Sequence, residues 1–175
     1  RDWRGVAQAL AALVDRLERP VVVKETGAGI SAATARRLAD MGVSAIDVAG
    51  AGGANWGLIE GERAIAPDDK AHAQAFSTWG LSTVESLKAV HHSCPDMTLI
   101  GSGGIRSGVD AAKAIRLGAS LIGQASAVLN AALISGEAVH AHFDLLSRQI
   151  RTTCFCAGAG DLRALRAARL IPGSD

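Results

Sequence analysis

Aromatic side chains are scarce in this chain of 175 residues, which has no tyrosine and only 3% aromatic residues in total. Glycine is plentiful by comparison, with 20 positions, and 49% of the residues are hydrophobic. A composition of mainly small side chains suits close packing of helices against a sheet. It argues against both an all-β sandwich and a disordered chain.

Other features that are scarce in the sequence exclude several classes of function. Three cysteines are too few for a disulfide framework, and no apolar run approaches the ~18 residues of a membrane span. With 18 basic and 17 acidic side chains, the net charge of +1 provides no broad surface for phosphate-rich polymers. We therefore expect a soluble, cytoplasmic protein that binds neither membranes nor nucleic acid. Because the chain opens on Arg1, without a start methionine or a secretory signal, we also expect a piece of a longer protein.

Hydrophobic periodicity predicts a strand-helix-strand unit in the first part of the chain. Residues 4–18 have helical spacing, and residues 21–23 form an apolar, β-branched run typical of a buried parallel strand. A glycine-containing loop follows, and Ser31 stands at the N-cap of a helix that ends at Gly42. Residues 43–48 are then expected to form the next strand.

The same plan returns later in the chain, as four pairs of corresponding residues show: Ser31 with Ser107, Gly27 with Gly103, Gly42 with Gly118, and Ile46 with Ile122. The repeat predicts a second unit with a strand at 99–100, a capped helix at 107–117 and a strand at 121–122. Between the two units we expect a loop or lid around 67–70 and a helix over 79–90.

Four strands alternating with helices predict an α/β fold, either part of a (β/α)8 TIM barrel or a small doubly wound sheet. Glycine clusters follow the carboxyl end of each strand, which favours the barrel, where sites lie on that rim. A closed barrel takes ~250 residues, so four strands would be half of one, with two open edges. Missing sequence, a partner copy or an unusual arrangement would supply the rest.

The segment from Ser102 to Gly108 has the outline of a phosphate site. Glycines let backbone amides approach an anion, and the following helix directs its positive end there. In barrels a phosphate is often held by the loops after the last two strands, which here are this segment and the turn at Ala125 and Ser126. The alternative is that the glycines only make tight turns.

Other polar residues have open interpretations. Lys24 follows an apolar strand and is expected to emerge at the same rim, where it suits an anionic cofactor; alternatively it pairs with Glu25 in solvent. Asp47 lies in an apolar strand and needs a partner if it is buried. The pair His91-His92 ends a helix and has no acidic or cysteine partner at suitable spacing, so we assign no metal ligands. No catalytic set can be assigned from spacing.

The chain resembles the type 2 isopentenyl-diphosphate isomerases over nearly its whole length. The motifs that carry the resemblance are Val22-Val23-Lys24-Glu25, Ile46-Asp47-Val48, Gly50-Ala51-Gly52-Gly53 with Trp56, Ser102-Gly103-Gly104-Ile105-Arg106-Ser107-Gly108, and Gly158-Ala159-Gly160-Asp161-Leu162. Related FMN-dependent barrels, including the 2-hydroxy-acid oxidases, share the phosphate-binding portion.

This resemblance implies that residues 1–175 are the carboxyl-terminal half, about the last four βα units, of one FMN-binding barrel domain. The implied enzyme interconverts isopentenyl and dimethylallyl diphosphate, needs Mg²⁺ and FMN reduced by NADPH, and makes no net redox change. A homo-oligomer with a small diphosphate substrate is expected. By position, the residues implied to surround FMN are Lys24, Ala49, Ala54, Gly103, Gly104, Arg106, Ala125 and Ser126.

The sequence departs from the family at two places. Ala54 stands where the family commonly has Thr, and Ala49 where some members have Ser, so the hydrogen bonds that those hydroxyls could make to FMN are absent. The family's His-x-Asn-x-x-Gln-Glu segment, which contacts the diphosphate and Mg²⁺, is absent, and these residues contain no Gln-Glu pair. Two alternatives to the isomerase therefore stay open: an FMN-dependent oxidoreductase of the 2-hydroxy-acid oxidase type, and a non-catalytic half-barrel that binds a phosphate-containing ligand.

Overall fold

A single parallel sheet forms the centre of the protein. The computed structural model describes residues 2–171. Its strands are β1 (Val22–Lys24), β2 (Ala45–Asp47), β3 (Thr98–Gly101) and β4 (Leu121–Ile122). They lie in the order β1-β2-β3-β4, and every neighbouring pair is parallel. A doubly wound sheet reverses its strand order at a switch point, whereas a barrel adds strands in sequence. The prediction of part of a (β/α)8 barrel is confirmed.

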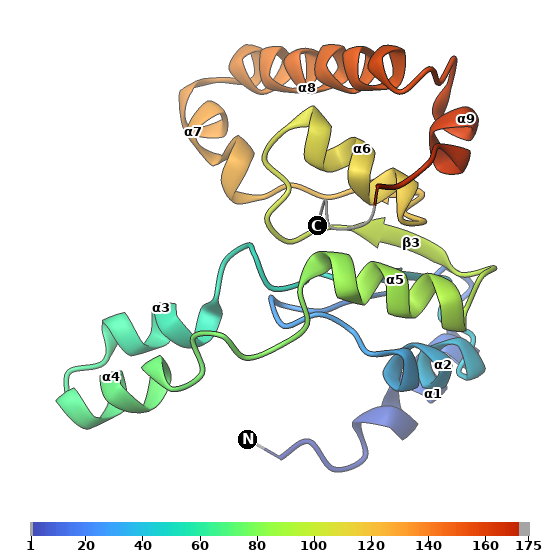
Figure 1. Ribbon diagram of the computed structural model, residues 1–175. Coiled ribbons are helices and arrows are strands. Elements are labelled where there is room, and N and C mark those ends of the chain that lie inside the picture. The colour runs from blue at the N-terminus through green and yellow to red at the C-terminus, as the bar shows by residue number, and fades with distance from the viewer. Residues whose placement is uncertain (1, 172–175) are drawn as a thin grey trace.

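Helices connect the strands and extend the chain beyond the sheet (Figure 1). The helices of the first part are α1 (Val6–Arg16), α2 (Ala32–Asp40), α3 (Trp56–Arg63), α4 (Pro67–Gln74) and α5 (Thr83–Ser93). Those of the second part are α6 (Gly108–Arg116), α7 (Ser126–Ile134), α8 (Gly136–Cys156) and α9 (Leu162–Ala167). The α3–α4 hairpin projects from the body, and α8 lies across α6.

The main core lies between the sheet and helices α2, α5 and α6. Its largest fully buried apolar side chains are Ile46, Val48, Leu87, Val90 and Leu99. A second buried cluster joins α6 to α8 and α9. Burial of such side chains contributes about 1.5–3 kcal/mol each. The core therefore fixes the strand ends from which the loops on the rim emerge.

The internal repeat predicted from the sequence is present in three dimensions. Ser31 and Ser107 both cap helices, because their hydroxyl oxygens accept hydrogen bonds from the amides of Thr34 and Asp110. Gly42 and Gly118 both end those helices with positive φ angles, 82° and 109°. These are backbone conformations that favour glycine.

Between the repeats, the structure contradicts one expectation and shifts the bounds of another. The stretch around 67–70 is not a loop or lid, because helix α4 begins there with Pro67 in its first turn. The helix expected over 79–90 begins later, after Ser82, whose side chain forms a capping box with Glu85. Residues 79–81 instead belong to the connection from the projecting hairpin.

The surface shows where this half of a barrel is open. Within residues 2–171, β1 and β4 have a strand neighbour on one side only, and Val22 and Leu121 on these strands are 50% and 57% exposed.

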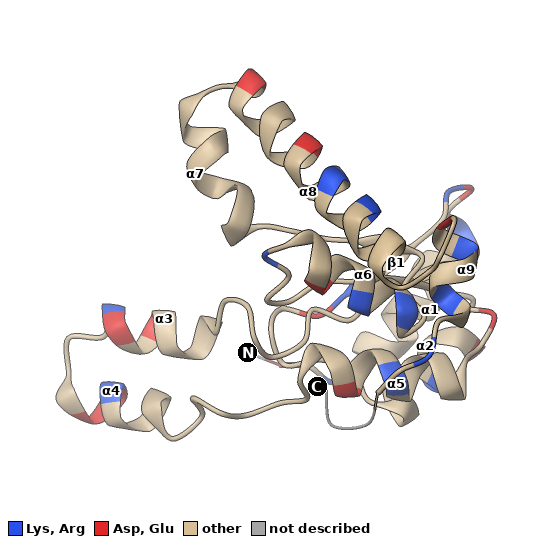
Figure 2. Cartoon of the chain, turned by 45° about the horizontal axis from the view of Figure 1, so that its top comes forward, with Lys and Arg blue, Asp and Glu red and all other residues tan. Residues whose placement is uncertain are grey.

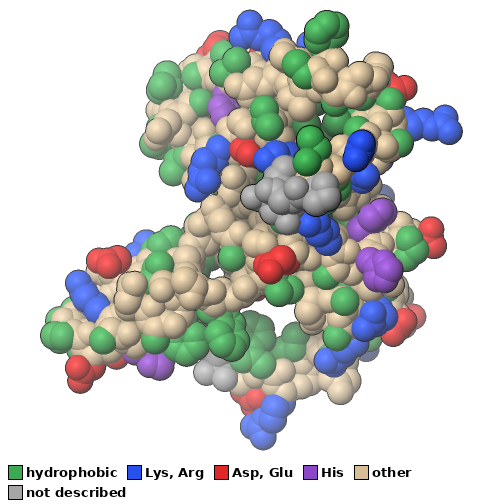
Figure 3. All heavy atoms as spheres, in the orientation of Figure 1, with side chains coloured by type: hydrophobic (Ala, Val, Ile, Leu, Met, Phe, Trp, Pro, Cys, Tyr) green, Lys and Arg blue, Asp and Glu red, His purple; other side chains and the backbone are tan. Residues whose placement is uncertain are grey.

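Basic and acidic residues are interspersed along the helices (Figure 2). Hydrophobic side chains gather along the lower side of the projecting hairpin (Figure 3). In the described residues, no helix has the length and apolarity needed to cross a membrane.

Candidate functional site

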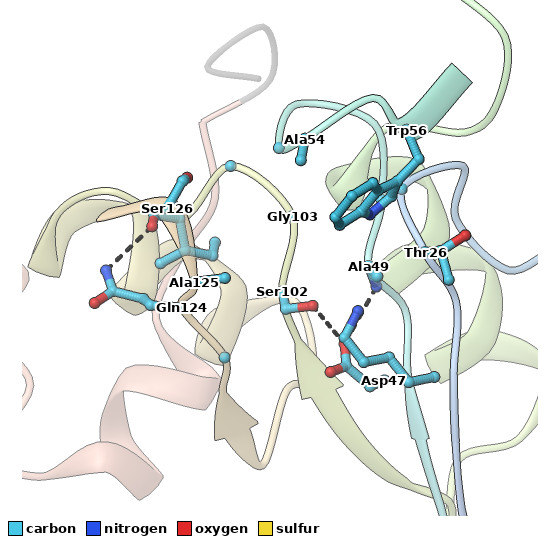
Figure 4. A pocket seen from close by; sticks show the side chains of 17 residues that line it. Thr26, Asp47, Ala49, Ala54, Trp56, Ser102, Gly103, Gln124, Ala125 and Ser126 are labelled. Carbon is cyan, nitrogen blue, oxygen red and sulfur yellow. Dashed lines mark hydrogen bonds between the residues drawn. The ribbon is translucent and has the colours of Figure 1, made fainter. Parts of the chain in front are cut away.

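A pocket of about 340 Å³ lies at the carboxyl ends of the four strands. This is the rim on which barrel proteins place their sites. Seven of the eight residues predicted to surround the cofactor line it: Lys24, Ala49, Ala54, Gly103, Gly104, Ala125 and Ser126. Figure 4 shows the loop with Gly103 between the Ala125–Ser126 turn and the segment with Ala49 and Ala54. Sequence segments far apart thus meet in one cavity.

The glycines of the 102–104 loop are required by a close approach between two backbones. Gly103 and Gly104 have φ angles of 97° and 76°. A Cβ on Gly103 would lie 2.2 Å from the carbonyl oxygen of Gly50, and one on Gly104 would lie 2.6 Å from that of Gly52. Only glycine fits such positions without displacing the neighbouring loop. The loop therefore packs against the 50–53 segment and also lines the pocket.

Most amides at the start of the helix that follows this loop are bonded to side chains of the protein itself. The carboxylate of Asp110 accepts hydrogen bonds from the amides of Arg106 and Ser107, at 3.1 and 2.9 Å, and the Gln149 side chain accepts one from the Gly108 amide at 2.7 Å. Burial opposes ionisation of Asp110, but the hydrogen bonds from Arg106 and Ser107 outweigh it and hold the pKa of Asp110 below its ordinary value. The N-terminus of α6 is therefore occupied by the protein's own side chains.

Helix α7 presents the opposite situation. It begins at Ser126, its N-cap residue is Ala125, and no side chain caps it. The first amides of a helix need a partner and favour an anion. Because Ala125 and Ser126 both line the pocket, this positive helix end faces the cavity beside the glycine loop. A short extra helix after the last strand is a known place for phosphate in barrels.

Lys24 lies at the opposite side of the pocket, at the end of β1. Its side chain is exposed, and its Nζ donates a hydrogen bond to the backbone oxygen of Glu25 at 2.7 Å. The carboxylate of Glu25 instead accepts from the amides of Gly27 and Ala28, both at 2.5 Å. The lysine therefore makes no ion pair with Glu25 and lines the rim of the pocket, and its contact with an anionic cofactor stays a prediction.

Asp47 has the partners that its burial requires. It is 7% exposed, and its carboxylate accepts hydrogen bonds from the hydroxyl of Ser102 and from the amide of Ala49, the latter at 3.2 Å. Figure 4 shows these bonds on the floor of the pocket. Since Asp47 ends β2 and Ser102 follows β3, the contact holds two neighbouring loops together. Buried carboxylates are tolerated where hydrogen bonds satisfy them.

Three predicted positions provide no side-chain hydrogen-bonding group to the pocket. Ala49 and Ala54 line the pocket without a hydroxyl, and Ala49 adopts a positive φ of 35°. Arg106 does not line the pocket. Its guanidinium Nη2 turns back and donates to the carbonyl oxygen of Gly52 at 3.1 Å. Arg106 therefore supports the 50–53 segment, and its contact with a cofactor stays a prediction.

The sequence assigned no role to several polar side chains of the site. Thr26 and Gln124 line the pocket, as does the hydroxyl of Ser102, which begins the predicted phosphate segment. Thr83 donates to the carbonyl oxygen of Gly103 at 2.6 Å. Each lies at or just after a predicted strand end, or at a helix start, and that signal was available. The described residues contain no cluster of three or more His, Cys, Asp or Glu side chains able to hold a metal.

The chain is similar to known proteins over nearly its whole length. The family model described as FMN-dependent dehydrogenase matches residues 3–172. Proteins named isopentenyl-diphosphate delta-isomerase match from Stutzerimonas stutzeri (59% identical, 98% of this chain, 49% of the relative) and Xanthobacter autotrophicus (57%, 95% and 48%). A protein of the same name from Synechocystis is 46% identical, over 94% of this chain and 47% of its own length. The resemblance drawn from the motifs is confirmed, and the chain spans about half the length of these relatives.

Solved structures show the same fold in more distant proteins. A putative lactate oxidase from Pediococcus acidilactici aligns with a TM-score of 0.73 at 21% identity, over 94% of this chain and 40% of that protein. Mandelate oxidase aligns with a TM-score of 0.69 at 23% identity, over 93% of this chain and 41% of that protein. At this identity the similarity establishes the fold alone.

Proposed function

Because this chain belongs to the FMN-dependent dehydrogenase family, we propose that the protein containing it is an FMN-dependent isopentenyl-diphosphate isomerase. In this proposal residues 1–175 are the carboxyl-terminal half of one barrel domain and supply the FMN-phosphate side of the site. The observation that carries the proposal is the uncapped start of α7 beside the glycine loop, in a pocket at the strand ends. The names of the relatives support the reaction.

The described residues fit FMN in shape and in charge. A phosphate dianion suits the first amides of α7, because no side chain competes for them. Gly123 lets the turn after β4 approach Ser102 closely on this side of the pocket, since a Cβ there would lie 2.9 Å from the Cβ of Ser102. The positive charge of Lys24 stands across the pocket from Ala125 and suits an electron-rich ring system. We propose that Ala49 and Ala54 contact the cofactor through backbone and methyl groups.

The residues of this chain would contribute orientation and charge to the reaction. Bound reduced FMN would supply the group that protonates the alkene and removes the allylic proton, so that the double bond moves without net oxidation. The Asp47–Ser102 contact fixes the floor of the pocket, and preorganised loops of this kind reduce the cost of ordering the bound molecules. Trp56 lies at the mouth, 55% exposed, where its ring can exclude water.

Other parts of the proposal draw on residues outside this chain. Mg²⁺ and the diphosphate of the substrate would be bound by the other half of the barrel, since the described residues contain no suitable metal cluster. NADPH would reduce the flavin, and a cytoplasmic homo-oligomer is the assembly that we propose.

A second candidate is an FMN-dependent oxidoreductase of the 2-hydroxy-acid oxidase type. Its support is the shared fold with mandelate and lactate oxidases, whose sequences are much less similar to this chain than those of the isomerases. The two candidates differ in electron balance. An oxidase consumes a 2-hydroxy acid and dioxygen and yields equal amounts of oxo acid and hydrogen peroxide, whereas an isomerase consumes neither oxidant nor reductant in proportion to product.

The test uses the full-length protein that contains this chain. Under reducing conditions, with FMN and Mg²⁺, we expect conversion of isopentenyl diphosphate to dimethylallyl diphosphate, with NADPH needed only in catalytic amounts. Product is measured by chromatography of the dephosphorylated alcohols. Protein that neither retains FMN nor converts the diphosphate would contradict the proposal, and stoichiometric oxidation of a 2-hydroxy acid would favour the second candidate.

A further inference from the structure

Gln124 links the two segments that line the phosphate side of the pocket. It is half-buried, lines the cavity and directly precedes Ala125. Its side-chain Nε2 donates a hydrogen bond to the carbonyl oxygen of Ile105 at 3.1 Å, and the bond is drawn at Gln124 in Figure 4. Ile105 directly follows Gly104 and is 8% exposed. One amide therefore joins the turn after β4 to the loop after β3.

His142, on helix α8, is hydrogen-bonded to the side-chain oxygen of Gln124. Its Nε2 lies 2.8 Å from the Oε1 of Gln124. Because a carbonyl oxygen only accepts, the contact with Ile105 must be made by the amide nitrogen of Gln124, and its oxygen must face the histidine. His142 must then carry a proton on Nε2. That nitrogen bears a proton in one neutral tautomer and in the charged ring, so the histidine donates in either state.

The arrangement forms a chain of hydrogen bonds from a rigid helix to the glycine loop. Helix α8 spans 21 residues and packs along α6, so His142 is a firm point of attachment. The last ladder bond between β3 and β4 runs from the Gly123 amide to the Gly101 oxygen, at 3.0 Å. Beyond it the two segments diverge toward the pocket, and the side chain of Gln124 spans them.

We propose that Gln124 and His142 act as a clamp that sets the spacing between the glycine loop and the start of α7. Gln124 is then a positioning residue for the phosphate of the cofactor, and His142 acts through it by fixing the amide in one orientation. A free glutamine side chain loses conformational entropy when it becomes ordered. In the clamp, the side chain of Gln124 is already ordered before the cofactor binds. This inference rests on the proposed function, because it concerns the same phosphate.

The experiment compares FMN with riboflavin, which lacks the phosphate, on the full-length apoprotein. Quenching of flavin fluorescence gives both dissociation constants, and their ratio reports the phosphate side alone. In Gln124→Leu we expect the preference for FMN to fall about 5- to 10-fold, the size of one or two lost hydrogen bonds, with riboflavin binding unchanged. His142→Ala should lower the preference in the same direction.

Two further variants test the donor role of His142. His142→Gln keeps a nitrogen donor near the position of Nε2 and should restore the preference for FMN. The double variant Gln124→Leu/His142→Ala should be no worse than Gln124→Leu, because both changes break one chain. His140→Ala is the matched control, since His140 lies on the same helix but is exposed and pairs with Asp144 at 3.1 Å.

The outcomes separate the clamp from the site itself. If the wild-type protein binds riboflavin as tightly as FMN, both the proposed phosphate site and the proposed clamp are wrong. If the wild type prefers FMN and Gln124→Leu keeps that preference, the site stands and the clamp is overturned. Equal weakening of FMN and riboflavin in Gln124→Leu would also overturn it, because that result shows a general structural role. If His142→Gln does not restore the preference for FMN that His142→Ala lowers, then His142 is not part of the clamp.

Discussion

The hydroxyl of Thr83 donates a hydrogen bond to the carbonyl oxygen of Gly103 at 2.6 Å. A second contact, 3.2 Å long, runs from the same hydroxyl to the carbonyl oxygen of Ser102. Thr83 is the first residue of α5 and is 8% exposed. A helix on the outside of the sheet therefore fixes the backbone of the glycine loop, so the loop's shape depends on the core as well as on its own sequence.

Replacing Thr83 with valine tests this contact. Thr83→Val keeps the shape of the side chain but removes the hydroxyl donor of the Gly103 carbonyl oxygen, whereas the Ser102 oxygen still accepts from the Gly50 amide. We expect a loss of about 1–2 kcal/mol in the free energy of unfolding. Urea denaturation of the full-length protein measures it. Thr152→Val is the control, since Thr152 is exposed and its hydroxyl bonds only within its own helix, to the Arg148 carbonyl. An equal effect in both variants would contradict the argument.

A methyl group at Gly103 should be much more damaging. It would meet the Gly50 oxygen at 2.2 Å in a backbone with φ of 97°, so we expect Gly103→Ala to cost about 3 kcal/mol or more from strain and overpacking together. Gly136→Ala is the control, because nothing lies within 4 Å of a Cβ at this helical glycine. That change should be neutral or stabilise by about 0.5–1 kcal/mol. Thermal unfolding of both variants checks the difference, and similar melting temperatures would refute it.

The elements that sequence predicted well are those set by local signals. Ser31 and Ser107 cap helices in the structure, as the sequence repeat predicted. A serine just before an apolar periodic run accepts a hydrogen bond from a free amide in the first turn of the helix, so the signal lies within a few residues. The missed start of α4 was also local: Pro67 in the first turn, followed by acidic residues that favour a helix N-terminus. The polar residues of this stretch therefore begin a helix, in which the acidic side chains favour the N-terminus.

The parts of the site that sequence could not provide depend on long-range packing. Nothing near Gly103 in the sequence indicates that Thr83 reaches its carbonyl, and nothing near Gly108 indicates that Gln149 accepts from its amide. That second contact, with the Asp110 cap, decides which helix end is free for an anion. The glycine pattern predicted the location of the site, whereas the tertiary contacts decide which amides remain available there.

Asp110 should make the stability of the protein depend on pH in the acidic range. Its pKa in the folded state lies below the ordinary value of 3.8, so the carboxylate stabilises the fold fully above about pH 5 and loses this effect as pH falls through the lowered pKa. We expect Asp110→Asn to be about 1 kcal/mol less stable than wild type at pH 7, with the gap closing below pH 4. Asp15→Asn, at an exposed position on α1, is the control. Denaturation curves between pH 3 and 7 measure both, and a gap that stays constant would exclude this role.

An aspartate at Ala125 separates phosphate binding from folding. Ala125 is exposed and occupies the uncapped N-cap position of α7. The new carboxylate should accept from the first amides of the helix, raising helix stability by about 0.5–2 kcal/mol, while it occupies and repels the phosphate position. We therefore expect Ala125→Asp to fold at least as stably as wild type and to bind FMN about tenfold or more weakly, by the same fluorescence titration. Ala132→Asp, an exposed change near the other end of α7, should leave FMN affinity unchanged. Wild-type affinity in Ala125→Asp would place the phosphate elsewhere, because a carboxylate and a phosphate dianion cannot share the same amides.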